Sequence, residues 1–144
     1  MFENQKKKSK NALLIFIKNP VLGTVKTRLA ASIGNEKALK IYYRLLEHTR
    51  CETQTLACDK LLFYSEKIEH DAWPTLFYQK YVQEKGDLGH KMKMAFQKAF
   101  EQGYEKVLII GSDCAELKKE HLEMAFEALE KHDVVVGQAN DGGY

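Results

Sequence analysis

Three cationic side chains stand close together in a loop that is rich in proline and glycine. The segment Lys18-Asn-Pro-Val-Leu-Gly-Thr-Val-Lys-Thr-Arg-Leu29 carries Lys18, Lys26 and Arg28, and it directly follows an apolar run over residues 12–17. Backbone N–H groups reach a ligand where glycine leaves room, and cations neutralise the ligand's charge. This combination is typical of a polyphosphate site. The alternative is an ordinary solvated loop.

A carboxylate follows the clearest buried run of the chain, residues 107–110. Asp113 lies in the segment Gly111-Ser-Asp-Cys114. At the end of a buried strand a carboxylate needs a cation or hydrogen-bond donors, because low-dielectric surroundings disfavour its charge. Its oxygens suit Mg²⁺ or Mn²⁺ bridging to substrate phosphates. A helix N-cap or an Asx-turn explains the residue equally well.

Two glycine-containing segments offer further contacts. Asp141-Gly-Gly-Tyr144 pairs a carboxylate with glycines that allow a close approach, so Asp141 either holds a substrate hydroxyl or caps a turn. Gly86-Asp-Leu-Gly89 precedes a helical pattern, where N–H groups could face a base or a phosphate. Simple entry into the helix is the interpretation that the local residues favour for this second segment.

Alternating strand and helix patterns predict the elements that position these residues. Predicted strands cover residues 12–17, 61–64, 107–110 and 133–136, with a short edge strand within 75–81. Predicted helices run from Asn35 to about 49, from Asp87 to before Gly103, and over 118–131. Such alternation indicates an α/β fold with a parallel sheet and right-handed crossovers. Since the loops after parallel strands share one edge, we expect the candidate residues to meet there.

Size, charge and cysteine content narrow the class of protein. The chain has 144 residues, 44% apolar content and a net charge of +2, which indicates one globular domain and argues against a nucleic-acid or membrane partner. No stretch approaches the ~20 apolar residues of a membrane span. Three cysteines without CxxC spacing and the absence of a signal-peptide pattern predict a cytoplasmic protein with reduced thiols.

Four segments occur in a characteristic order. They are Phe16-Ile-Lys-Asn-Pro-Val-Leu-Gly-Thr-Val-Lys-Thr-Arg-Leu29, Gly86-Asp-Leu-Gly-His-Lys-Met92, Gly111-Ser-Asp-Cys-Ala-Glu-Leu117 and Gly137-Gln-Ala-Asn-Asp-Gly-Gly-Tyr144. Together they resemble the DUF2064 family of glycosyltransferase-A-like transferases, also called radical-SAM/selenodomain-associated transferase 1. The resemblance implies a nucleotide-diphospho-sugar transferase fold, with a mostly parallel sheet between two layers of helices. It also implies kinship to phospholactate and molybdenum-cofactor guanylyltransferases.

The same resemblance implies roles for individual residues. Those implied to bind the nucleotide are Lys18, Gly23, Thr24, Lys26, Arg28, Gly86 and Gly89. Asp113 would hold the divalent ion, Mg²⁺ or Mn²⁺, and would act in catalysis together with Lys26 and Arg28. The glycines of the second segment would line the base pocket.

The implied reaction takes one of two forms. Asp141, Gly142 and Gly143 would face the sugar or a small-molecule acceptor. Cations and metal would stabilise charge on the diphosphate as the transferred group leaves. Attack at an anomeric carbon would release a nucleoside diphosphate, whereas attack at the α-phosphorus would transfer a nucleotidyl group and release pyrophosphate. The residues serve both schemes.

Family members continue beyond the position of Tyr144 by some tens of residues. We therefore expect residues 11–144 to form a domain that is incomplete at its C-terminus, preceded by a disordered basic leader over residues 1–10. The further part would carry strands and a second acidic metal contact. A third interpretation stays open, a non-catalytic remnant that binds a nucleotide or a partner. An unpaired edge at the final strand would favour a homo-oligomer.

Overall fold

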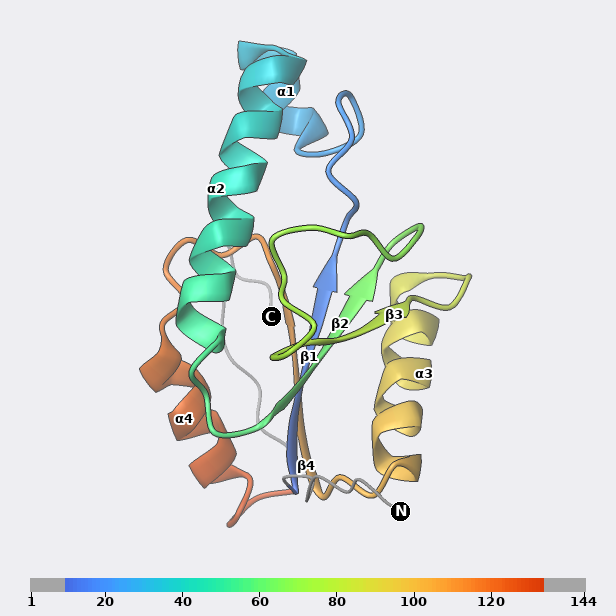
Figure 1. The fold of residues 1–144 in the computed structure, drawn as a ribbon, viewed down its shortest axis with the longest axis vertical. Coiled ribbons are helices and arrows are strands. Elements are labelled where there is room, and N and C mark those ends of the chain that lie inside the picture. Colours follow the sequence, from blue (N-terminus) through green and yellow to red (C-terminus); the bar gives the residue numbers. More distant parts are fainter. Residues whose placement is uncertain (1–9, 134–144) are drawn as a thin grey trace.

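The structure is a computed structural model that describes residues 10–133, and Figure 1 shows the arrangement of its elements. These residues form four strands and four helices. The elements in chain order are β1 (Asn11–Ile17), α1 (Thr27–Ile33), α2 (Asn35–Thr53), β2 (Asp59–Tyr64), β3 (Gln79–Val82), α3 (Leu88–Glu101), β4 (Lys106–Gly111) and α4 (Lys119–Ala128). The leader over 1–9, the predicted strand beyond residue 133 and the glycine segment at 137–144 lie outside the described residues.

All strands of the described sheet run parallel, in the order β3-β2-β1-β4. β1 lies between β2 and β4, and Leu14 pairs with Leu61 on one side and Ile109 on the other. A strand in this position is covered on both faces, which explains why residues 12–17 are apolar without alternation. The predicted parallel α/β sheet is confirmed.

Each face of the sheet packs against its own helices. Leu13 and Ile15 of β1 join a core that includes Tyr42 and Leu46 of α2 and Leu122 of α4. The alternate residues of β1, Ala12 and Leu14, join a second core with Ala95 and Ala99 of α3. Figure 1 shows α2 and α4 on one side of the strands and α3 on the other. The predicted three-layer arrangement is therefore confirmed.

The helix α2 differs from its prediction at both ends. Asn35 is its first residue, whereas the N-cap is Gly34 at φ +95°, and no side chain caps the helix. The helix also continues beyond the predicted end near residue 49. Thr49 and Thr53 are buried, and their hydroxyls donate to the carbonyls of Leu45 and Thr49, so these polar residues are accommodated inside the helix.

The helix α3 begins as predicted, but its first residue, Leu88, is exposed to solvent. Asp87 is the N-cap, and its Oδ1 accepts the backbone N–H of His90 at 2.8 Å. Helical spacing predicts that Leu88 shares the buried face of Ala95 and Ala99, yet it is 64% exposed. The buried residues of α3, Ala95 and Ala99, lie in its second half, and the apolar residue at its start remains open to solvent.

Three smaller differences concern element boundaries. A short helix, α1, follows the cationic loop, and the sequence pattern did not predict it. β3 begins at Gln79 because a turn closes before it, in which the N–H groups of Phe77 and Tyr78 donate to Pro74 O. α4 ends at Ala128, three residues earlier than predicted. Within the described residues, no helix is both long and apolar enough to cross a membrane.

Candidate functional site

The chain reverses its direction across the sheet between β1 and β4. It builds β1, β2 and β3 in succession toward one edge and then returns to place β4 on the other side of β1. The crossover after β1 uses α2 on one face, and the crossover before β4 uses α3 on the opposite face. In open α/β sheets, ligands bind outside the carboxyl ends of the strands at such a switch point.

An ion pair joins the two loops that leave this switch point. Lys26 Nζ, in the loop after β1, lies 2.7 Å from Asp113 Oδ1, after β4. The Lys26 side chain is 26% exposed and that of Asp113 is 65% exposed, so both are open to a ligand. The structure thus brings together the predicted cation and the predicted carboxylate.

Lys26 also has an unusual backbone. Its φ of +52° and ψ of +46° are left-handed, and it is the one non-glycine residue with positive φ among the described residues. Such a conformation costs about 1–3 kcal/mol and persists only where the surroundings impose it, which happens most often at functional sites. Val25, the preceding residue, is buried in the core and anchors the loop on one side. The strain at Lys26 therefore supports a functional interpretation of this position.

The other predicted residues of the first loop have separable tasks. Gly23 adopts φ +86°, a conformation that a side chain would strain. Thr24 closes the turn, because its N–H and its hydroxyl both donate to Val21 O, at 3.0 and 2.8 Å. Lys18 and Arg28 are exposed. Gly23 and Thr24 shape the loop, and the cations are left at its surface.

The buried hydroxyl of Tyr42, in α2, connects the loop after β1 to the loop after β4. Its hydroxyl accepts the backbone N–H of Lys18 at 2.8 Å and donates to Lys18 O at 3.0 Å. The same oxygen lies 3.3 Å from Ser112 Oγ. Burial raises the pKa of the Tyr42 phenol, which therefore stays protonated. Helical spacing over residues 35–49 predicts only that Tyr42 faces the core, and no sequence signal distinguishes its hydroxyl from those of other buried tyrosines.

Asn19 ties the cationic loop to the β2–β3 connection. It is 4% exposed, and its Oδ1 accepts the N–H groups of Glu66 at 2.8 Å and Lys67 at 3.2 Å. Its Nδ2 donates to Lys67 O at 2.8 Å and to the Glu69 carboxylate. No sequence motif singles out Asn19. The available signal was a polar amide two residues after a buried strand and directly before a proline.

The predicted base-pocket glycines lie at the same edge of the sheet but at its other end. Gly86, at φ +126°, and Gly89 flank the start of α3, which follows β3. A Cβ at Gly86 would lie 3.0 Å from His90 Cδ2, so this position is close-packed. Three strand spacings separate β3 from β4, which is roughly 14 Å. The edge is thus long enough for a nucleotide with its phosphates beside Lys26, and the base pocket remains a prediction.

The predicted metal ligand, Asp113, does not belong to a cluster of three or more ligating side chains among the described residues. Within residues 10–133, no three His, Cys, Asp or Glu side chains are grouped to hold a metal ion. Mg²⁺ is commonly bound through one or two carboxylates together with substrate phosphates and water. Asp113 fits an ion of that kind, in which most of the ligands belong to the bound phosphates. It does not form a metal site by itself.

Comparison with known proteins places the chain in a family. A family model described as "Uncharacterized protein conserved in bacteria (DUF2064)" matches residues 49–144, which is most of the chain. The chain belongs to the DUF2064 family. No curated protein matches it.

A solved structure shares the fold of this DUF2064 protein. It is the crystal structure of a "putative nucleotide-diphospho-sugar transferase" from Desulfovibrio desulfuricans G20, with 33% sequence identity and a TM-score of 0.83. The similarity covers 94% of this chain and 61% of the other. The DUF2064 chain thus spans less than two thirds of the length of that relative.

Part of the predicted site lies outside the described residues. The structure describes Lys18, Gly23, Thr24, Lys26, Arg28, Gly86, Gly89 and Asp113. Asp141, Gly142 and Gly143, predicted to face the sugar or acceptor, are not among the described residues. The roles assigned to all of these residues remain predictions, although the proximity of Lys26 to Asp113 is now established.

Proposed function

We propose that this DUF2064 protein is a metal-dependent transferase that binds the diphosphate of a nucleotide or nucleotide-diphospho-sugar at the switch point between β1 and β4. The observation that carries the proposal is the Lys26–Asp113 pair, which joins the two loops there at 2.7 Å. The name of the solved relative, which shares 33% of its sequence with this chain, supports the same class of substrate.

The chemistry would be electrostatic. Lys26, Lys18 and Arg28 supply positive charge where a departing diphosphate gains negative charge, and Lys26 is already held in place by its backbone and by Asp113. A divalent ion, when bound between Asp113 and the phosphates, would neutralise further charge. No described residue is needed as a covalent nucleophile in this scheme, because the acceptor itself attacks the transferred group.

The group transferred decides between two reactions. Transfer of a sugar from a nucleotide-diphospho-sugar forms a bond from the acceptor oxygen to the anomeric carbon and releases a nucleoside diphosphate. Transfer of a nucleotidyl group forms a bond to the α-phosphorus and releases pyrophosphate. We favour the first because the solved relative is named for nucleotide-diphospho-sugars. Pyrophosphate release from a nucleoside triphosphate would establish the second.

The decisive variant is Asp113→Asn, tested by calorimetric titration with UDP and GDP, with and without Mn²⁺. We expect the Mn²⁺-dependent part of the affinity to fall about tenfold or more, as expected for loss of a charged contact. A matched control is Glu130→Gln, since Lys106 and Glu130 form another ion pair at 3.1 Å with side-chain exposures of 29% and 63%. Unchanged Mn²⁺-dependent binding in Asp113→Asn would refute the assigned role.

A further inference from the structure

Gln83, the first residue after β3, ties three strands together at the carboxyl edge of the sheet. Its side-chain Nε2 donates to Ile17 O at the end of β1 and to Phe63 O in β2, each at 3.0 Å. Its backbone N–H donates to Tyr64 O at 2.9 Å. A glutamine held by three such bonds has little rotational freedom left.

These bonds also determine the orientation of the Gln83 amide. Both partners of the side chain are carbonyl oxygens, which only accept, so the nitrogen must face Ile17 and Phe63. The oxygen, Oε1, is then directed away from these two carbonyls. Among residues 10–133 no hydrogen bond engages Oε1, and Gln83 is half-buried. The edge of the sheet therefore carries a pre-oriented acceptor.

The position of this acceptor relates it to the proposed phosphate site. Ile17, which holds the amide, directly precedes Lys18 and the cationic loop. On the other side, Gln83 leads into the segment with Gly86 at the start of α3. Gln83 thus lies between the Lys26–Asp113 pair and the start of α3, where the base of a bound nucleotide would extend from its phosphates.

We propose that Gln83 Oε1 reads the base of the nucleotide and selects uracil or guanine over adenine or cytosine; this rests on the proposed function. In uracil and guanine the ring nitrogen of the pairing edge carries a hydrogen, which an acceptor can bind. In adenine and cytosine the corresponding nitrogen presents a lone pair, which would face Oε1 without a hydrogen between them. The acceptor is already immobilised by its backbone bonds, so binding orders no further side chain.

The test compares the dissociation constants of UDP, GDP, ADP and CDP for the full chain in the presence of Mn²⁺. We expect UDP or GDP to bind at least about tenfold more tightly than ADP and CDP, the effect of leaving unpaired an acceptor that the bound base shields from water. N3-methyl-UDP, in which a methyl group replaces the hydrogen on the ring nitrogen, should lose at least a similar factor relative to UDP. This analogue tests the contact in the unaltered protein.

The variant Gln83→Met removes the amide at nearly constant side-chain length. It should bring the ratio of the dissociation constants of ADP or CDP to those of UDP or GDP close to one. Its matched control is Gln79→Met at the opposite end of β3, where Gln79 Nε2 donates to Tyr104 OH at 3.4 Å. The ratio between bases should stay unchanged in this control. Since the ratio compares ligands on one protein, a general loss of stability does not move it.

Each other outcome is decisive. Equal binding of all four nucleotides, a preference for ADP or CDP, or full affinity for N3-methyl-UDP would overturn the inference and leave the proposed function standing. An unchanged ratio in Gln83→Met would overturn the assignment to this residue. Failure of every nucleotide to bind would overturn the proposed function itself, and the inference with it.

Discussion

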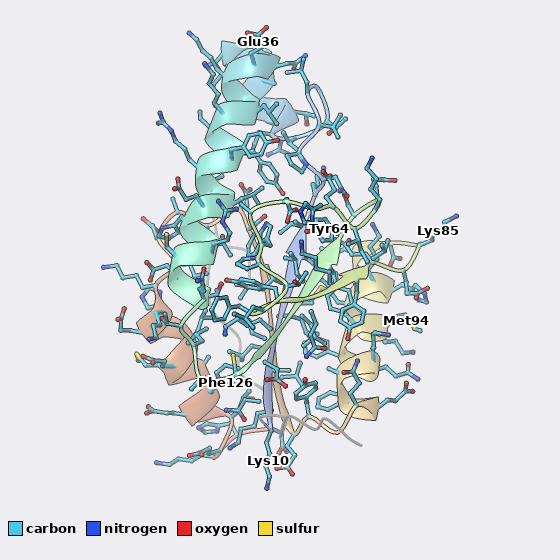
Figure 2. The ribbon with its side chains drawn as sticks, in the orientation of Figure 1. Lys10, Glu36, Tyr64, Lys85, Met94 and Phe126 are labelled. Carbon is cyan, nitrogen blue, oxygen red and sulfur yellow. The ribbon has the colours of Figure 1, made fainter. Side chains whose placement is uncertain are left out.

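The carboxyl edge of the sheet has two halves that use polar residues in opposite ways. Beside β2 and β3, polar groups are buried: Tyr64 is 0% exposed, and its hydroxyl donates to Asp71 Oδ2 at 2.7 Å. Lys80, with a side chain 8% exposed, pairs with Asp71 Oδ1 at 2.9 Å. Beside β1 and β4, the Asp113 side chain is 65% exposed, and Lys18 and Arg28 are also exposed. Figure 2 labels Tyr64 near the carboxyl ends of β1 and β2.

This difference indicates that the β2–β3 half mainly stabilises the fold, whereas the β1–β4 half presents charges to a ligand. In the β2–β3 half the polar groups bind one another, and among the described residues no buried side-chain nitrogen or oxygen lacks a hydrogen-bond partner. Such a network rigidifies the structure, and Gln83 Oε1 is the acceptor that we propose it leaves for a ligand. In the β1–β4 half the charges face solvent, and the strained backbone of Lys26 is kept there. A ligand can bind only where polar groups are still available.

The largest effect expected from this comparison is on stability, in the buried half. Lys80→Met removes a mostly buried ammonium group, its bond to the Asp71 carboxylate and its bond to Glu69 O, so we expect the free energy of unfolding to fall by about 2–3 kcal/mol. Lys26→Met, in the exposed pair, should change it by less than about 1 kcal/mol. Urea unfolding measures both. Equal losses of unfolding free energy in Lys80→Met and Lys26→Met would contradict the proposed difference between the two halves of the edge.

A smaller effect combines stability with binding. Tyr42→Phe removes the hydroxyl that joins Lys18 to Ser112. Tyr78→Phe removes a hydroxyl outside the site, whose oxygen lies 2.8 Å from Thr53 Oγ1. Both phenols are buried, and burial raises the pKa of each, so both variants lose a neutral hydroxyl. We expect each to lose about 1–2 kcal/mol of unfolding free energy.

Only Tyr42→Phe should also weaken the binding of UDP or GDP, by several-fold, because only this hydroxyl sets the spacing of the two loops. Calorimetric titration of both variants measures the difference. A similar loss of affinity in Tyr78→Phe would show that general loosening, rather than the loop spacing, controls binding.

The smallest expected effect is a change in the reactivity of one thiol. Cys114 directly follows Asp113 and is exposed, and Cys51 is exposed in α2. We expect nucleotide with Mn²⁺ to slow alkylation of Cys114 by iodoacetamide several-fold at pH 8 and to leave Cys51 unchanged. Burial raises the pKa of Cys58 to about 11, so this thiol stays protonated at pH 8 and should react only after unfolding. Equal protection of Cys51 and Cys114 would contradict binding at the switch point.

Local patterns in the sequence were sufficient for the architecture. The apolar runs of β1 and β4 predicted buried parallel strands because a strand covered on both faces needs apolar residues at every position. Asp87 was recognised as a helix cap because its short carboxylate reaches the N–H three residues later. The order of strands and helices then placed the cationic loop and Asp113 at one edge.

The sequence could not supply contacts that depend on which strand ends lie side by side. Lys26 and Asp113 are 87 residues apart, and the Gln83 amide binds carbonyls 66 and 20 residues away. Helical spacing predicts the wrong burial for Leu88, because it shows which face of α3 a residue occupies and not whether another element covers that face at its position. Periodicity and helix capping depend on residues that are close in the sequence, so local sequence patterns determined most of the helices and strands. Strand order and register bring distant residues together, so only the tertiary structure decided which of them could form a site.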